Sequence, residues 1–569
     1  MATLKLSSNA LLNFFYFILF MPQLALGFSV ATPSPWSTEA AIEVLRKGGN
    51  ATDAMVAASF ALNVSQPHSM GIGGGGFYLA SKDGKVFFWD HRETAPSSAH
   101  EKMFLDEKGE PIPYEPERIT GPNPVGIPGT VLGLHEAHQK LGKLAWKTLL
   151  EPAIRIAKNG IPISENFEEA LKEEWERLSL FPTTSAIFGD REGSYLKAGR
   201  VLRQPLLANT LEQIQQKGAK DFYQGNLAKS WTNEAQQLGV KINLDDLKAY
   251  KVQKRKPIEF KVFGLTGYTA PPPSASGIMV AAVLRYLEQH YRGRELPSPD
   301  SASRVAVTAE AMRYFQKVRN ENIADPTTNR LDPQKFLNSP EEKKAWAEIH
   351  RNVRKRLDQI ETAVTLRNLD AGSTVSQGSF TENGHTAHLS IVDDSGHAVA
   401  YTTTIEAWFG SGLAVTGHGF LLNNELSDFN AEPGHPNSAA PGKRPRSNMS
   451  PTLLFENQKP VAALGCAGGP RIPTVIVELL ENYYLHRMTA REAIAFPRFH
   501  YSINDDKLYI EKGFPTSTLQ QLKDAGYNVV MGQVGGVAQA VMRRSSKNKW
   551  EAAAEPRWDA MAVSWEPIR

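Results

Sequence analysis

Two threonines in a stretch of alternating residues have the spacing most suited to chemistry in this sequence. Residues 386–392 and 397–405 are rich in β-branched side chains, and an Asp-Ser-Gly turn at 394–396 separates them. We expect a hairpin with a three-residue loop whose glycine takes the left-handed conformation. In that register Thr386, at the start of the first strand, lies directly opposite Thr404.

A hydroxyl at the start of such a strand can cut its own chain. Attack of the Thr386 side chain on the carbonyl carbon of His385 would break the peptide bond between them and leave Thr386 as a new N-terminus. The freed α-amine, with a pKa near 8, would then lie beside the hydroxyl and act as its base. Threonine is also an ordinary strand residue, so the spacing alone leaves a purely structural hairpin open.

Other motifs for catalysis or cofactor binding are incomplete. The glycine run at 73–76 lacks the Lys-Ser/Thr of a phosphate-binding loop, which favours a tight turn or a close approach of two backbones. His135 and His138 lack the spacing of a His-Glu-x-x-His zinc motif, and no Gly-x-Ser-x-Gly nucleophile motif occurs. The single cysteine, Cys466, excludes an internal disulfide and a cysteine-clustered metal site, and we expect it to be buried rather than reactive. No metal or organic cofactor is expected.

The composition is that of a large globular chain. Its 569 residues are 41% hydrophobic and 22% charged, with 36 prolines in no repeat, which excludes wholesale disorder and a collagen-like fibre. The formal net charge of +3 gives no electrostatic reason to expect nucleic-acid binding. A basic Lys5, an apolar run over 10–21 and small residues at 25–27 predict a signal peptide over 1–27. An uncleaved membrane anchor is the alternative, and the mature chain is otherwise expected in a periplasm or the medium without a membrane span.

Helices and short strands must position the hairpin. Apolar spacing over 38–63 predicts a helical region that is broken at Gly48-Gly49-Asn50. A strand at 77–79 and a turn around Asp83-Gly84 lead into a second strand at 86–89.

The remainder of the first two thirds is dominated by helical periodicity. Residues 130–364 are mostly helical, and the alternating charges from 343 to 356 and beyond indicate a solvated helix face rather than a basic patch. Residues 367–384, directly before the hairpin, have the composition of an exposed loop.

Several longer motifs resemble, in order, those of the γ-glutamyltransferase (γ-glutamyl transpeptidase) family. The stretches similar to its large subunit are 48–54, 67–69, 71–77, 92–96, 222–225 and 270–277. Those similar to its small subunit are 386–390, 421–429, 443–452 and 468–469. The similarity spans about 39–557 and implies the fold of an N-terminal-nucleophile hydrolase, an α/β four-layer α/β/β/α sandwich. It also implies cleavage into a large subunit, 28–385, and a small catalytic subunit, 386–569, which remain together as one intertwined heterodimer.

The resemblance assigns the catalytic groups and the reaction. Thr386 would be both the autoprocessing residue and the nucleophile, and Thr404 would orient it. The backbone N–H groups of Gly468 and Gly469 would hold the oxyanion. The implied reaction is attack on the γ-amide of glutathione or a related donor, followed by transfer of the γ-glutamyl group to water or to an amino acid or peptide.

The resemblance also assigns the residues that bind the amino-acid head of the donor. Arg92 and Ser447 match the groups that clamp its α-carboxylate, and Glu425 and Asp428 match the acceptors for its α-ammonium. Without the motif context each of these charges would be interpreted as part of a surface ion pair.

Three departures from the family pattern concern donor binding. Glu406 stands where an asparagine is common, and Asn448 stands where a second serine usually contacts the donor carboxylate, with Arg446 adding a charge nearby. Residues 430–442, which form a lid in many members, are few, so we expect an open site that accepts bulky or polymeric γ-glutamyl donors.

Two other functions remain open at this point. A cephalosporin acylase of the same fold removes glutaryl groups, but glutaryl lacks the ammonium that Asp428, Glu425 and Glu406 would bind. An exported, uncleaved protein that only binds amino acids is the alternative from another functional class. Cleavage of the purified chain into two fragments distinguishes the enzyme from the binding protein.

Overall fold

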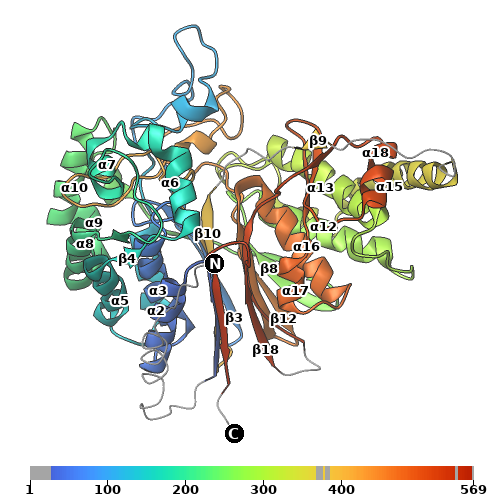
Figure 1. Ribbon diagram of the computed structural model, residues 1–569, viewed down its shortest axis with the longest axis horizontal. Helices are drawn as coiled ribbons and strands as arrows, with labels where there is room; N and C mark the ends of the chain where they lie inside the picture. Colours follow the sequence, from blue (N-terminus) through green and yellow to red (C-terminus); the bar gives the residue numbers. More distant parts are fainter. Residues whose placement is uncertain (1–26, 367–375, 378–384, 545–548, 567–569) are drawn as a thin grey trace, which may run out of the picture.

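The computed structural model describes residues 27–366, 376–377, 385–544 and 549–566. The predicted signal peptide and the predicted loop at 367–384 therefore lie outside the described residues, except for Gly27 and the two residues 376–377. Of the helices in the described ranges, none combines the length and hydropathy that spanning a bilayer requires. Two sheets stack face to face at the centre of the molecule, and helices cover both outer faces (Figure 1).

The first sheet has the predicted hairpin at its centre. Over the described residues its order is β19 (Met561–Trp565), β1 (Phe28–Thr32), β10 (Thr386–Asp393), β11 (Ala398–Thr404), β2 (Gly75–Lys82), β3 (Lys85–Asp90) and β6 (Gln253–Lys254). All neighbouring strands pair antiparallel. Strands from before and after Thr386 are therefore neighbours within a single hydrogen-bonded sheet, at β19–β1, β1–β10 and β11–β2.

The second sheet is also antiparallel and packs against the first. Its order is β18 (Trp550–Ala554), β17 (Val537–Arg543), β13 (Lys459–Ala467), β12 (Thr452–Glu456), β8 (Leu265–Thr269) and β7 (Ile258–Val262). Side chains alternate along the strands, so that Phe77 and Leu79 enter the core between the sheets while Tyr78 and Ala80 face the helices.

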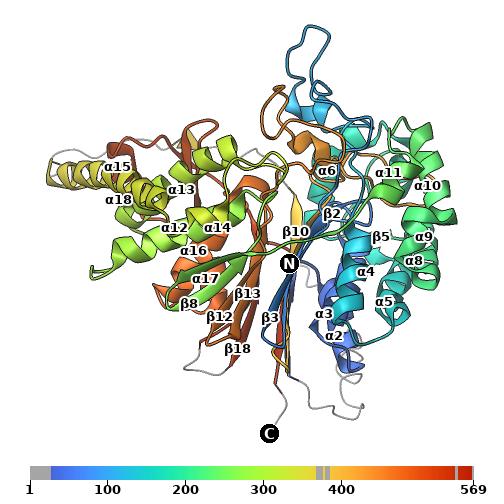
Figure 2. The same cartoon turned by 180° about the vertical axis from the view of Figure 1, so that it is seen from behind.

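Two groups of helices complete the four layers, as both views show (Figure 2). The first group consists of α2 (Pro35–Arg46), α3 (Ala51–Ser65), α4 (Thr130–Leu141), α5 (Trp146–Asn159), α6 (Glu165–Leu178), α7 (Pro182–Phe188), α8 (Pro205–Lys217), α9 (Ala219–Gln224), α10 (Asn226–Gln237) and α11 (Leu244–Ala249). The second consists of α12 (Ser276–Tyr291), α13 (Ala302–Asn322), α14 (Pro333–Phe336), α15 (Pro340–Leu366), α16 (Ile472–Tyr484), α17 (Ala490–Ala495) and α18 (Thr516–Asp524). Each group shares a buried apolar core with the sheet beneath it. The predicted α/β/β/α sandwich is confirmed.

Small elements fill the periphery. A minor sheet contains β14 (Phe499–Ser502), β15 (Lys507–Ile510), β16 (Val529–Met531) and β9 (Ser376–Gln377), and β4 (Ile161–Pro162) pairs with β5 (Val201–Leu202). Three short helical turns, η1 (Tyr114–Arg118), η2 (Glu425–Asp428) and η3 (Gly469–Arg471), contribute residues to the same pocket.

The hairpin register is confirmed. Thr386 pairs with Thr404, and the pairing continues to Val392 and Ala398 at the loop. Gly396 has a φ of 79°, and its N–H donates to the carbonyl of Asp393 at 3.0 Å. Local turn chemistry therefore sets which side chains lie opposite each other at the far end of the hairpin.

The predicted elements near the N-terminus are also confirmed. Gly48 ends α2 with a φ of 83°, and Asn50 caps α3 through a capping box with Asp53. Asp83 and Gly84 form the turn of the β2–β3 hairpin, both with positive φ. The middle third is mostly helical as expected, but it also supplies the β7–β8 hairpin, whose short alternating runs stand between helical stretches.

Candidate active site

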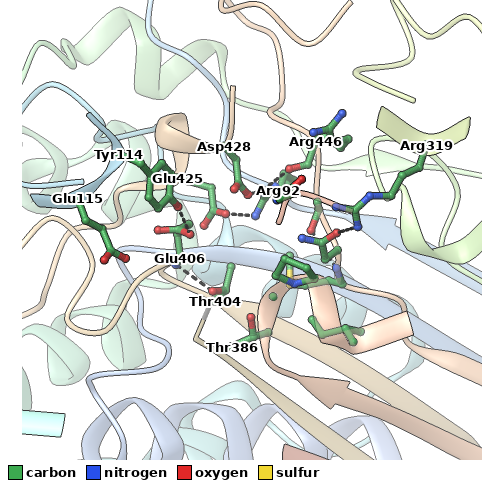
Figure 3. Close-up of a pocket in the computed structure, with 17 residues that line it drawn as sticks. Arg92, Tyr114, Glu115, Arg319, Thr386, Thr404, Glu406, Glu425, Asp428 and Arg446 are labelled. Atoms are coloured by element: carbon green, nitrogen blue, oxygen red, sulfur yellow. Dashed lines mark hydrogen bonds and ion pairs between the residues drawn. The ribbon is translucent and has the colours of Figure 1, made fainter. Parts of the chain in front are cut away.

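A pocket of about 520 Å³ lies at the end of the hairpin that begins with Thr386. Its lining residues are Arg92, Tyr114, Glu115, Arg319, Thr386, Thr404, Glu406, Glu425, Asp428, Arg446, Ser447, Asn448, Met449, Gly469, Pro470, Ile472 and Asn504. Every predicted site residue except Gly468 is among them, and Gly468 directly precedes Gly469. Figure 3 shows Thr386 and Thr404 at the strand ends, with Arg92, Glu425 and Asp428 on the other side of the cavity.

The peptide bond between His385 and Thr386 is held in place by the chain around it. The Thr404 hydroxyl donates to the carbonyl oxygen of His385 at 2.7 Å, and the backbone N–H of Glu406 donates to the Thr404 hydroxyl at 2.8 Å. The backbone N–H of His385 donates to the carbonyl of Glu406 at 3.0 Å, and the His385 ring stacks on Trp408 with centroids 3.8 Å apart. The carbonyl next to Thr386 is therefore polarised by a hydrogen bond and fixed on both sides.

The glycine run at 73–76 packs against the backbone at Thr404 and Leu421. A side chain on Gly74 would collide with the carbonyl oxygen of Thr404, and one on Gly73 with that of Leu421. The glycines therefore permit the close backbone approach that the sequence indicates.

Gly468 and Gly469 form a tight corner between β13 and the helix that follows. Their φ values are 127° and 54°, which L side chains rarely adopt. The backbone N–H and the Nε of Arg471 donate to the Gly468 carbonyl oxygen, at 3.2 and 2.8 Å. Because the carbonyl and the next N–H of a trans peptide point in opposite directions, the Gly469 N–H points away from Arg471. As the first residue of η3, Gly469 has an N–H without an intrahelical acceptor, which suits it to bind an oxyanion.

Arg92 is buried at the centre of a carboxylate cluster. Its guanidinium donates to Glu425 and, at 2.6 Å, to Asp428. It also donates to the carbonyl oxygens of Pro445 at 3.2 Å and Arg446 at 2.9 Å. Arg92 and Glu425 are each 1% exposed, so these charges form a buried cluster rather than the surface pairs that isolated charges would suggest.

The cluster contains more acidic groups than the arginine balances. One carboxylate oxygen of Glu406 and one of Glu425 are buried without a hydrogen-bond partner among the described residues, as are both oxygens of Glu93. Burial, with Asp428 nearby, raises the pKa of Glu425 to about 7. Burial and the neighbouring carboxylates also raise the pKa of Glu406 and of Glu93 well above the usual value. A cation placed among these oxygens would satisfy both their charge and their hydrogen bonding.

Tyr114, the first residue of η1, covers the acidic end of the pocket, where Figure 3 shows it beside Glu406. Its hydroxyl donates to Glu406 at 2.8 Å while its ring is partly exposed, and Arg118 ties the same turn to the carbonyl of Phe429. No residue of 430–442 lines this pocket in the described structure, so the wall here comes from the Tyr114 loop instead.

The pocket contains residues that the sequence analysis did not assign. They are Tyr114, Glu115, Arg319, Met449, Pro470, Ile472 and Asn504. Met449, Pro470 and Ile472 lie within three positions of assigned residues, so proximity along the chain would have found them. Tyr114 and Arg319 reach the pocket from elements distant in sequence, and no motif around either residue indicates a role in the site.

The remaining predictions concern metals and the cysteine. Within the described ranges, no group of three or more His, Cys, Asp or Glu side chains has an arrangement that would hold a metal ion. Cys466 is buried, and burial raises the pKa of its thiol to about 12, so it packs as a small side chain as expected.

Comparison with known proteins points to one family. A family model described as gamma-glutamyltranspeptidase matches residues 37–565. The glutathione hydrolase proenzyme of Pseudomonas aeruginosa is 35% identical over 558 residues, which cover 95% of this chain and 95% of that protein. A crystal structure of Helicobacter pylori gamma-glutamyltranspeptidase is 33% identical, with a TM-score of 0.52 over 55% of this chain and 89% of that one. Cephalosporin acylase from Bacillus halodurans superposes with a TM-score of 0.81 over 97% of this chain and 98% of that one, at 23% identity, a likeness that concerns the fold.

Proposed function

The chain belongs to the gamma-glutamyltranspeptidase family, and we propose that Thr386 both matures it and carries its reaction. The protein is an enzyme that transfers or hydrolyses the γ-glutamyl group of glutathione and related compounds, and it is made as a self-cleaving proenzyme. One observation supports the assignment of Thr386 most strongly. The carbonyl that Thr386 must attack already accepts a 2.7 Å hydrogen bond from Thr404, inside the pocket that Gly469 also lines.

Maturation begins with attack of the Thr386 hydroxyl oxygen on the carbonyl carbon of His385. The negative charge develops on the oxygen that Thr404 already contacts. Collapse breaks the C–N bond and leaves an ester on Thr386, whose nitrogen takes up the hydroxyl proton. Water then hydrolyses the ester, which leaves a carboxylate on His385 and restores the Thr386 hydroxyl.

The mature enzyme repeats this chemistry on the donor. The new α-amine takes the Thr386 hydroxyl proton as the oxygen attacks the donor γ-carbonyl, and then returns the proton to the leaving amine. The N–H groups of Gly468 and Gly469 stabilise the oxyanion. Water or the amine of an acceptor next attacks the γ-glutamyl ester and restores the hydroxyl.

The donor head binds on the far side of the pocket from Thr386. Its α-ammonium lies among Glu406, Glu425 and Asp428, where carboxylate oxygens lack partners. Its α-carboxylate contacts Ser447, Asn448 and Arg92. Burying both charges is favourable only when each is paired, so a donor that lacks either one is turned over less efficiently.

The two fragments, 28–385 and 386–569, remain together because they share the same sheets. Within the first sheet, β10 from the small fragment pairs with β1 from the large one, and β11 pairs with β2. Separating the fragments would expose both strand edges and the core between the sheets. The signal peptide predicted over 1–27 directs the enzyme out of the cytoplasm.

The identity of the donor is tested by comparing p-nitroanilides of γ-glutamate and glutarate, which differ only in the α-ammonium. We expect wild-type enzyme to favour the γ-glutamyl substrate by at least about 100-fold in kcat/KM, because glutaryl leaves buried carboxylates unpaired. Glu406→Gln should reduce this preference by removing one of them. A wild-type enzyme that prefers glutaryl-p-nitroanilide would instead be an acylase.

The pKa of Glu425 predicts how binding of the product L-glutamate depends on pH. This pKa is raised to about 7 by burial, so the carboxyl is neutral below that pH and its attraction for the ammonium is lost. Glutarate lacks the ammonium and is the matched control. We therefore expect inhibition by L-glutamate, relative to glutarate, to weaken as pH falls from 8 to 6. In Glu425→Gln the ratio of the inhibition constants of L-glutamate and glutarate should depend less on pH. A ratio that does not change with pH in the wild-type enzyme would contradict the assignment of Glu425.

A further inference from the structure

Two of the three residues assigned to the donor carboxylate, Ser447 and Asn448, accept hydrogen bonds from neighbouring protein groups. Ser447 accepts a bond from the Met449 N–H at 3.1 Å through its hydroxyl oxygen. Asn448 accepts bonds through its side-chain oxygen from the Arg319 guanidinium and, at 3.5 Å, from the Ser276 hydroxyl. Their acceptor atoms are therefore occupied by protein groups.

The partner of Asn448 also decides which way its amide faces. A guanidinium has only N–H donors, so Arg319 must bind the amide oxygen and not the amide nitrogen. The NH₂ group consequently points away from Arg319, and within the described structure it donates to no protein group. The Ser447 hydroxyl proton likewise has no acceptor there, and both residues line the pocket. Two donors are thus presented to whatever occupies it.

An additional carboxylate clamp is needed because Arg92 is already engaged. Its guanidinium binds Glu425 and Asp428 as well as two backbone carbonyls, so a ligand carboxylate must compete with those bonds. Arg319 reaches the same pocket from the end of α13, where it is only 9% exposed and its Nε donates to the Asn320 side chain at 3.1 Å. Figure 3 shows its guanidinium directed into the cavity.

We propose that Arg319 is a positioning residue for donor recognition, which fixes Asn448 so that its amide NH₂ and the Ser447 hydroxyl bind the α-carboxylate. This role rests on the proposed function. It also explains how asparagine can replace the usual serine. An amide could turn either its oxygen or its NH₂ group toward the ligand carboxylate, and Arg319 binds the oxygen so that the NH₂ group faces the pocket. Arg319 belongs to the large fragment and Asn448 to the small one, so the clamp is completed across the cleavage products.

The test compares γ-glutamyl-p-nitroanilide with 4-aminobutyryl-p-nitroanilide, which keeps the amine and lacks only the α-carboxylate. We expect Arg319→Met to lower kcat/KM about tenfold for the first substrate, the effect of losing one well-oriented bond to a charged group. The second substrate should change less than about twofold. Arg319→Lys, which retains a donor for the amide oxygen, should lose less. Arg313→Met is the matched control on the same helix, because Arg313 is partly exposed and is not among the pocket residues.

The variant Asn448→Ser distinguishes orientation of the amide by Arg319 from a direct effect of the Arg319 charge on the donor. In Asn448→Ser there is no amide to orient, so adding Arg319→Met should change the γ-glutamyl kcat/KM less than about twofold. An equal tenfold loss in that background would overturn the proposal, as would equal losses on both substrates or an unchanged selectivity in Arg319→Met. Failure of the proposed function would show separately, as wild-type enzyme without γ-glutamyl turnover. The affinities of L-glutamate and 4-aminobutyrate, measured by calorimetry in each variant, would then still test the carboxylate clamp, because these two ligands differ only in the α-carboxylate.

Discussion

Replacing Thr386 with alanine should leave a single full-length polypeptide with no measurable γ-glutamyl transfer. The same hydroxyl cuts the chain and accepts the acyl group, so its loss removes both steps at once. We expect turnover to fall on the order of 10⁶-fold, as for other nucleophiles of acyl transfer. Gel electrophoresis of the purified protein and hydrolysis of γ-glutamyl-p-nitroanilide measure the two effects.

Thr386→Ser is the matched control, because it keeps a hydroxyl at the same position. It should still cleave itself into two fragments and retain activity, although more slowly, since serine lacks the methyl group that restricts χ1. An alanine variant that is cut at the same bond, or that turns over donor, would show that another group performs the chemistry.

Thr404→Val should produce the second largest effect, a slowing of self-cleavage by about 10² to 10³-fold. Valine has nearly the shape of threonine but cannot donate the 2.7 Å hydrogen bond to the His385 carbonyl, where the oxyanion forms. The uncleaved precursor should accumulate and convert to fragments over hours to days. The measurement is a time course of cleavage after rapid purification.

The neighbouring Thr403 provides a matched control, because its hydroxyl also donates a hydrogen bond to a backbone carbonyl. Its hydroxyl donates to the Gly75 carbonyl at 2.8 Å, and the side chain is fully buried, but it points to the other face of the strand. Thr403→Val therefore loses a buried hydrogen bond without touching the scissile peptide, and it should mature at nearly the normal rate. If Thr403→Val and Thr404→Val slowed cleavage alike, general destabilisation rather than oxyanion stabilisation would be the cause.

The parts of the site that the sequence predicts are those set by local rules. Strand alternation and the turn glycine at 396 determine the pairing of Thr386 with Thr404. The capped break between α2 and α3 and the β2–β3 turn follow in the same way from residues next to each other in the chain. The family motifs add residues such as Arg92 and Gly469, which lie at the expected pocket.

Other features depend on distant parts of the chain meeting in the fold. Arg92 binds Glu425 and Asp428, residues more than 300 positions away, and the resulting excess of buried carboxylate is visible only once they are together. Tyr114 comes from a proline-rich loop, and Arg319 from a charge-rich helix on which nothing distinguishes it from its neighbours. Glu406 adopts a φ of 77°, a conformation that its sequence does not indicate.

The mass of the small fragment, measured while wild-type enzyme turns over γ-glutamyl-p-nitroanilide, tests the central claim most directly. We predict a fragment of residues 386–569 with one added glutamyl group, and fragmentation that places this group on the N-terminal threonine. A glutamyl group on another residue, a fragment with a different first residue, or an intact chain that turns over the donor would contradict the account.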